Sequence, residues 1–189
     1  MIEIRRAERR QVGEILRITN EEAARSIATA AYHDEPLERW ESAWDQEHEA
    51  YPWLVAIQDA ETARERVIAY AKASPFNPRD GFMWSVSLSV YLETAQRGTG
   101  LAAQLYELLF SLLRAQGYQA VYARVALPNP ASIKLHERFG LKQTGLLPQF
   151  SWKFDRWYDL AILTGRLSEL KGPPPALKSV TEVWELKRP

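Results

Sequence analysis

The feature that most constrains the fold of this sequence is a long strand, a glycine-rich turn and a helix in direct succession. Residues 84–92 alternate between apolar and small polar side chains, which is typical of a β-strand. Residues 96–102 read Gln-Arg-Gly-Thr-Gly-Leu-Ala, and a leucine stripe over residues 101–112 predicts a helix that ends near Gly117. Because glycines permit a tight turn and free N–H groups at a helix start attract anions, this segment is a candidate anion-binding turn.

The turn is not that of the common nucleotide-binding motifs. It lacks the Gly-Lys-Ser/Thr sequence of a nucleoside-triphosphate loop and the glycine spacing of a dinucleotide fingerprint. Arg97 supplies a side chain for a charge-assisted contact with an anion. Taken alone, the turn is compatible either with ligand binding or with a purely structural role.

The rest of the chain alternates strand and helix patterns without an internal repeat. Strands are predicted near residues 2–4, 53–57, 67–71, 120–126, 142–147 and 158–167, and helices over residues 8–24, 36–50 and 129–140. A length of 189 residues suits one mixed α/β domain, which we place at residues 1–167. Residues 168–189 form a proline-containing tail with Val180, Val183, Trp184 and Leu186 on its apolar side, and this tail packs either on its own domain or on a dimer partner.

Composition excludes several classes of function. Lys and Arg number 24, equal to the 24 Asp and Glu, so no basic excess suggests nucleic-acid binding. The absence of cysteine excludes disulfides, thiolate metal sites and a cysteine nucleophile. The three histidines lack the spacing of a helical metal pair, so we expect no metal. No secretory signal or apolar stretch of about 20 residues is present, and we expect a cytoplasmic protein that binds no membrane.

A second motif gives the sequence a family resemblance. Residues 126–140 read Ala-Leu-Pro-Asn-Pro-Ala-Ser-Ile-Lys-Leu-His-Glu-Arg-Phe-Gly. Together with the glycine turn, this segment resembles the two acyl-CoA-contacting elements of the GNAT superfamily of N-acetyltransferases. Residues 51–56, 129–132, 135–137 and 157–159 resemble the phosphinothricin acetyltransferase branch most closely.

The resemblance implies a fold and a co-substrate. The fold is a mixed sheet of about six to seven strands, flanked by about four helices, in which two parallel strands splay apart where acetyl-CoA enters. The residues that match the family's acetyl-CoA contacts are Leu88, Ser89, Val90, Arg97, Gly98, Thr99, Gly100, Leu101, Ala102, Asn129, Ser132 and His136.

The resemblance also implies where proton transfer takes place. Branch members carry a glutamate base on the long strand, and Ser87 stands at that position here. A serine hydroxyl is a poor base, but it can hold a water molecule. His136 occupies the position where many relatives have a tyrosine near the CoA sulfur. Its titration range suits proton transfer near neutral pH, and the alternative is that it only packs against CoA. We therefore name Ser87 and His136 as candidate catalytic residues.

Three residues are candidates for the acceptor side. Glu35 either binds an ammonium group or simply begins a helix, Ser87 faces the acceptor, and Lys153 either meets an acceptor carboxylate or is solvated. Ser87 replaces the carboxylate base of the branch and Pro148 replaces an arginine, so we expect phosphinothricin itself to be a poor acceptor.

The function implied is transfer of an acetyl group from acetyl-CoA to the primary amine of a small amino-acid-like molecule, by direct attack in a ternary complex. The alternatives are acetylation of a protein N-terminus or ribosomal protein, and a CoA-binding sensor with impaired catalysis. Members of the GNAT superfamily are often dimers, so the resemblance suggests a homodimer.

Overall fold

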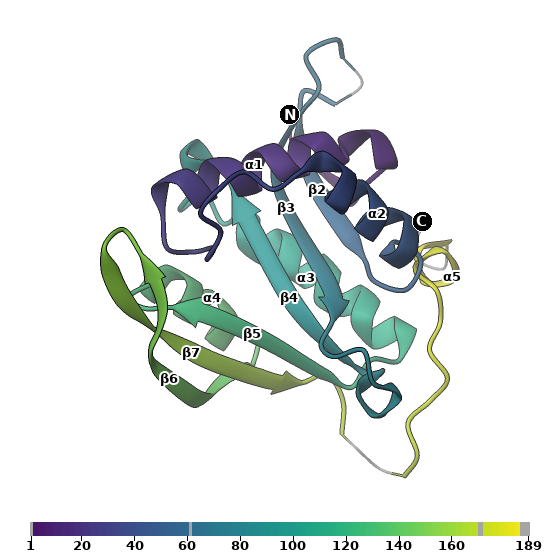
Figure 1. Ribbon diagram of the computed structural model, residues 1–189. Helices are drawn as coiled ribbons and strands as arrows, with labels where there is room; N and C mark the ends of the chain where they lie inside the picture. The colour runs from purple at the N-terminus through teal and green to yellow at the C-terminus, as the bar shows by residue number, and fades with distance from the viewer. Residues whose placement is uncertain (1, 61, 170–171, 186–189) are drawn as a thin grey trace.

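The computed structural model describes residues 2–60, 62–169 and 172–185. In this part of the chain, one sheet carries seven strands in the order β1-β2-β3-β4-β5-β7-β6 (Figure 1). The strands are β1 (Ile2–Arg6), β2 (Trp53–Gln58), β3 (Arg66–Pro75), β4 (Ser85–Leu92), β5 (Ala120–Ala126), β6 (Lys142–Lys153) and β7 (Arg156–Arg166). The helices are α1 (Val12–Arg25), α2 (Leu37–Glu47), α3 (Leu101–Gln116), α4 (Pro130–Arg138) and α5 (Val180–Glu185).

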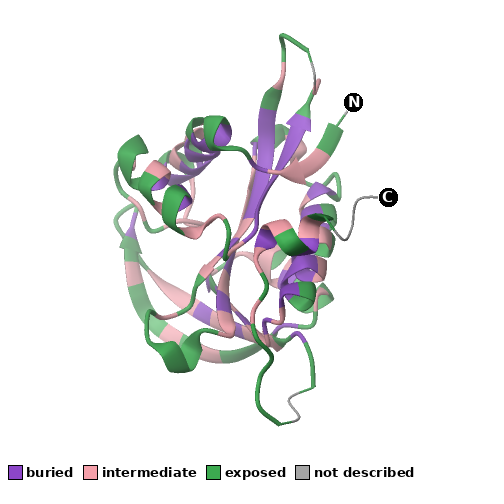
Figure 2. Ribbon diagram, turned by 90° about the vertical axis from the view of Figure 1, so that its right-hand side faces the viewer, coloured by how far each residue is buried: buried purple, intermediate pink, exposed green. Residues whose placement is uncertain are grey.

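Two hydrophobic cores hold the helices on the sheet. Under α1 and α2, Trp53 of β2 meets Trp40 and Trp44 edge-on, with ring centroids 5.9 and 5.4 Å apart. The other core contains the leucine stripe of α3 and the alanines of β3, whose small side chains let the helix approach closely. Buried residues accordingly follow the central strands and the inner faces of the helices (Figure 2).

The parallel pair β4–β5 is short. It joins Ser85 to Ala120, Val86 to Val121 and Ser87 to Tyr122, and the pairing ends there. Beyond it, residues 88–92 of β4 pair with β3, and residues 123–126 of β5 pair with β7. The two strands diverge visibly toward their C-terminal ends (Figure 1). The predicted mixed sheet with a splayed parallel pair is therefore confirmed.

Several boundaries differ from those expected. Strand β3 continues to Pro75, because its ladder with β4 extends to the pair Pro75–Val86. Strand β6 runs six residues beyond the expected end at Leu147, because Phe154 and Asp155 make a tight turn with positive φ that brings Lys153 opposite Arg156. Helix α1 begins at Val12, after a single 3-10 turn.

The C-terminal segment lies against its own chain. Trp84 Nε1 donates a hydrogen bond to the carbonyl of Pro175 at 2.7 Å, and Gln116 Nε2 donates to that of Lys178 at 3.0 Å. Val183 is fully buried and contributes to the core under α3. Leu186, which was expected on the apolar side of the tail, lies outside the described residues. In the described part of the chain, the helices are too short or too polar to cross a membrane.

Candidate active site where β4 and β5 separate

The glycine turn has the conformation that its sequence requires. Gly98 and Gly100 adopt left-handed φ angles of +78° and +87°, which glycine tolerates best, and Gly100 is the N-cap residue of α3. A Cβ built on either glycine would meet no heavy atom within 4 Å. The turn therefore presents backbone and open space at the positive end of a 16-residue helix, which suits an anion.

Arg97 is held beside this turn by α1. Its guanidinium contacts the carboxylate of Glu22, which is buried and also bonds Arg25 at 3.2 Å. Glu22 thus fixes the position of Arg97 while Arg97 itself stays exposed. The predicted contact of Arg97 with pyrophosphate remains a prediction, and it requires the guanidinium to share or leave Glu22.

The second predicted acyl-CoA element is built as a capped helix start. Asn129 Oδ1 accepts a hydrogen bond from the backbone N–H of Ser132 at 3.1 Å, and Pro130 occupies the first turn of α4. This cap accounts for the Asn-Pro-x-Ser sequence by local chemistry. It also sets the start of α4 directly beyond the diverging end of β5.

His136 lies on α4 in an apolar environment. It is 4% exposed, and its ring centroid lies 5.6 Å from that of Tyr106 on α3. Burial lowers the pKa of His136 to about 4, so the imidazole is neutral at pH 7. The expectation of a titration near neutral pH is therefore not met, because the sequence pattern did not reveal how deeply the ring is buried. With this pKa the imidazole is a weak base at pH 7, but its neutral ring can still donate one hydrogen bond and accept another.

Two buried polar atoms beside α4 lack partners. Within the described residues, neither His136 Nδ1 nor the Tyr106 hydroxyl has a hydrogen-bond partner. Burying such groups unpaired is costly, so they fit a site completed by a ligand or by ordered water. The free edge of β4 and the open glycine turn separately offer backbone donors and acceptors that suit the amides and phosphates of an acyl-CoA.

A small cavity lies on the face of the sheet toward α2. Antiparallel pairing places Ser74 of β3 beside Ser87 and places Lys72 beside Ser89. Between α2 and β3 lies a cavity of about 210 Å³, whose lining includes Glu35, Arg39, Trp40, Glu47, Lys72 and Ser74. Glu35 lines this cavity, whereas Ser87 does not and is connected to it only through its cross-strand neighbour Ser74.

Charged groups in this cavity have unusual environments. Glu35 accepts a hydrogen bond from Trp40 Nε1 at 3.1 Å and lies 3.5 Å from the guanidinium of Arg39. Burial raises the pKa of the Glu47 carboxyl, and burial lowers the pKa of Lys72 to about 8. The cavity thus brings two carboxylates and two cations together around an indole ring.

Lys153 has different partners from those expected. It is 3% exposed, and its Nζ donates hydrogen bonds to the carbonyls of Ala23 at 2.6 Å and Thr29 at 2.9 Å. Lys153 is therefore not a solvated lysine, which was one of the two expectations. The other expectation, a contact with an acceptor carboxylate, stays a prediction. These bonds attach the β6–β7 hairpin to the last turn of α1 and to the loop after it. Tyr91 also holds this loop, through a hydrogen bond to the carbonyl of Ala28 at 3.0 Å.

Sequence reasoning missed Lys72, Glu47 and Glu22. Lys72 carried a usable signal, because it is the one charged residue in the otherwise apolar run of residues 67–73. A charged residue on a buried strand usually has a specific partner or a function. Glu47 and Glu22 lie on amphipathic helices among many other acidic residues, so nothing in the sequence distinguished them.

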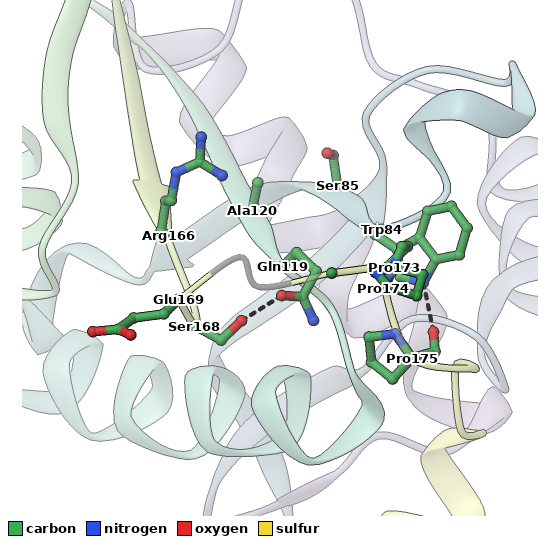
Figure 3. A pocket seen from close by; sticks show the side chains of 11 residues that line it. Trp84, Ser85, Gln119, Ala120, Arg166, Ser168, Glu169, Pro173, Pro174 and Pro175 are labelled. Atoms are coloured by element: carbon green, nitrogen blue, oxygen red, sulfur yellow. Dashed lines mark hydrogen bonds between the residues drawn. The ribbon is translucent and has the colours of Figure 1, made fainter.

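A larger cavity, of about 460 Å³, lies at the other end of β4 (Figure 3). Its lining includes Trp84, Arg166 and Pro175, and Ser168 bonds Gln119 across it. It lies beside the paired ends of β4 and β5 rather than their diverging ends. It is therefore separate from the candidate active site.

Comparison with known proteins decides the family. A family model described as an acetyltransferase (GNAT) domain matches residues 4–162. This chain belongs to the GNAT acetyltransferase family. It is 36% identical over 149 residues to L-methionine sulfoximine/L-methionine sulfone acetyltransferase of Pseudomonas aeruginosa, covering 77% of this chain and 84% of the relative. It is 30% identical to phosphinothricin N-acetyltransferase of Streptomyces viridochromogenes, covering 96% of each chain.

Comparison with a solved structure also identifies the fold as that of a GNAT acetyltransferase. A GNAT superfamily phosphinothricin acetyltransferase from Sinorhizobium meliloti, solved in complex with acetyl-CoA, matches with a TM-score of 0.82 at 27% identity, covering 93% of each chain. The predicted family and branch are confirmed, and this GNAT protein is an N-acetyltransferase. Among the described residues, no group of three or more His, Asp or Glu side chains is arranged to hold a metal ion.

Proposed function

We propose that this GNAT enzyme acetylates the primary amine of a small amino-acid-like acceptor, with acetyl-CoA as acetyl donor, by direct attack in a ternary complex. The observation that carries the proposal is the end of the β4–β5 pairing at Ser87 and Tyr122, beside a cavity lined by charged side chains. The free edge of β4 is available to the donor, and the face toward α2 is available to the acceptor.

In this proposal, different segments of the chain bind different parts of acetyl-CoA. Backbone groups of Leu88, Ser89 and Val90 are free of β5 and can bond the amides of the pantetheine arm. The N–H groups from Gly98 to Ala102 lie at the positive end of α3, where the helix dipole favours phosphates. Asn129 and Ser132 begin α4 beside them. Bound acetyl-CoA supplies the activated acyl group, and the protein supplies position and charge.

Proton transfer needs a group that accepts a proton at neutral pH. The acceptor amine must lose a proton to become a nucleophile. Ser87 lies at the last parallel pair and can hold a water molecule that carries this proton away. The pKa of His136 is about 4, so the imidazole is neutral and a weak base at pH 7, and we place it beside the acyl-CoA as a hydrogen-bonding group. These roles follow from position and protonation state together.

The relatives support an amino-acid-like acceptor. Two of the most similar proteins are named for acetylating methionine sulfoximine, methionine sulfone or phosphinothricin, all of which are amino acids or analogues. A narrow cavity of about 210 Å³ with both signs of charge suits such a zwitterion better than a folded protein surface. We therefore rank acetylation of a protein below this proposal.

A thiol-release assay with a panel of amines tests the proposal. The panel contains L-methionine sulfone, L-methionine sulfoximine, phosphinothricin, spermidine and a short peptide, and mass spectrometry identifies the acetylated product. We expect the two methionine derivatives to release CoA in equimolar amount with product. Acetylation of the peptide alone would favour a protein substrate, and tight acetyl-CoA binding without turnover of any amine would favour a sensor.

We also propose a homodimer in the cytoplasm. The dimer is supported by the exposed aromatic side chains of the β6–β7 hairpin, since Phe150, Phe154 and Trp157 are each more than half exposed. The location is supported by the use of acetyl-CoA, an intracellular metabolite. Analytical ultracentrifugation and cell fractionation test these two points. A monomer at micromolar concentration would contradict the first.

A further inference from the structure

The ammonium group of Lys72 lies over two indole rings. Its Nζ lies 3.9 Å from the ring centroid of Trp53 and 4.9 Å from that of Trp40. Within the described residues it makes neither a hydrogen bond nor a salt bridge. The indole faces stabilise the charge, but they leave its N–H donors unused.

Lys72 lines the cavity between α2 and β3 together with Glu35, Arg39 and Glu47. The two glutamates attract the lysine and the arginine repels it, but none of them pairs with it directly. A cation with free donors in a partly closed cavity is therefore available to an anionic group of a bound molecule.

The position of Lys72 connects this cavity to the reacting centre. Lys72 lies opposite Ser89 and Ser74 lies opposite Ser87, so all four side chains are on one face of the sheet. Lys72 and Ser74 are two residues apart, about 7 Å along a strand. One ligand can therefore reach the ammonium of Lys72 with one end and the separation of β4 and β5 with the other.

We infer that Lys72 is a specificity-determining residue that binds the carboxylate of the acceptor amino acid. The inference rests on the proposed function. A single carboxylate fits better than a phosphate, because Glu35 and Glu47 line the same cavity and would repel a dianion. Lys153, which was expected in this role, already donates two hydrogen bonds to backbone carbonyls.

The inference gives a distinctive pH dependence. Burial lowers the pKa of Lys72 to about 8, against attraction by Glu47 and Glu35 and with a small repulsion from Arg39. The group is therefore charged below pH 8 and loses its charge above it. The KM of the wild type for an acceptor with a free carboxylate should rise above pH 8, and replacing Lys72 by methionine should remove this rise.

Two matched acceptors and three variants test the inference. The acceptors are L-methionine sulfone and its primary carboxamide, which lacks the carboxylate and has a less basic α-amine, so each variant is compared with the wild type on the same acceptor. The variants are Lys72→Met, which keeps the length and removes the charge, Lys72→Arg, which keeps the charge, and the exposed control Lys142→Met. Circular dichroism and thermal melting establish that each variant is folded.

We expect Lys72→Met to lower kcat/KM for the sulfone about ten- to a hundredfold, mainly through KM, and to change that for the carboxamide less than threefold. Lys72→Arg should recover part of the loss, and Lys142→Met should match the wild type. Equal losses on both acceptors, or no loss on either, would overturn the inference while leaving the proposed function in place. If the wild type acetylated spermidine but neither methionine derivative, both the inference and the proposed function would be wrong.

Discussion

Ser87 of β4 and Tyr122 of β5 form the last parallel pair before the two strands separate. On one side of this pair lie the free edge of β4 and the glycine turn. On the other lies the cavity that contains Glu35 and Lys72. A donor and an acceptor can therefore approach the same point from opposite faces of one strand. This arrangement allows the acetyl group to pass directly between two bound substrates.

Replacing Gly100 by aspartate should abolish acetyl-CoA binding. The new carboxylate would stand in the open space at the start of α3 and repel the phosphates. The control is Gly172→Asp, at a glycine outside the candidate active site. Gly172 also has a positive φ, +75°, and a Cβ built on it would likewise meet no heavy atom within 4 Å. Calorimetric titration should show loss of binding in the first variant only. Equal affinities in the two variants would refute the assignment of the turn.

His136 should make stability depend on pH. Its pKa in the folded state is about 4, below the ordinary 6.5, so the unfolded chain binds its proton first as pH falls. Stability from this residue is complete above pH 6.5 and is lost progressively toward pH 4, by about 3 kcal/mol in total. Urea unfolding of wild type and His136→Phe across this range measures the difference. A constant difference between the two proteins would mean that the histidine is not buried in solution.

The substitution His136→Phe should also lower kcat more than it weakens the binding of acetyl-CoA. A side chain that only packs against CoA would be replaced well by phenylalanine, with kcat retained at saturation. We expect instead that kcat falls at least tenfold while the Kd of acetyl-CoA changes less than threefold, because the buried imidazole nitrogen is lost. Steady-state kinetics and calorimetry on the same preparation distinguish the two roles.

Lys153→Met should destabilise the protein by about 1–3 kcal/mol, because two backbone carbonyls lose a buried donor. Its effect on acetylation should be the same for L-methionine sulfone and for the carboxamide, in contrast to that of Lys72→Met. A selective loss on the sulfone would instead restore Lys153 as the carboxylate-binding residue.

The C-terminal helix should stabilise its own domain. Val183→Ala removes a fully buried side chain, with an expected cost of about 1–3 kcal/mol, whereas Glu185→Ala changes an exposed position and should be neutral. Thermal melting at several protein concentrations measures both. A loss that disappears at high protein concentration would show that the tail packs on a dimer partner.

The sequence predicted the parts of the site whose chemistry is local. Each of three elements is formed by consecutive residues, so its conformation follows from those residues alone: the long strand, the glycine turn and the cap at Asn129. The partners of Lys153 lie more than a hundred residues earlier in the chain, and no local pattern could identify them. The environments of His136 and Lys72 depend in the same way on helices that pack from elsewhere, which is why their protonation states emerged only from the fold.

The most direct test of this account is a crystal structure of the protein with acetyl-CoA. We predict the pyrophosphate at residues 97–102, and the pantetheine arm along residues 88–90 with its thioester near Ser87 and Tyr122. Acetyl-CoA bound elsewhere, for example in the cavity beside Trp84 and Arg166 at the other end of β4, would contradict the account.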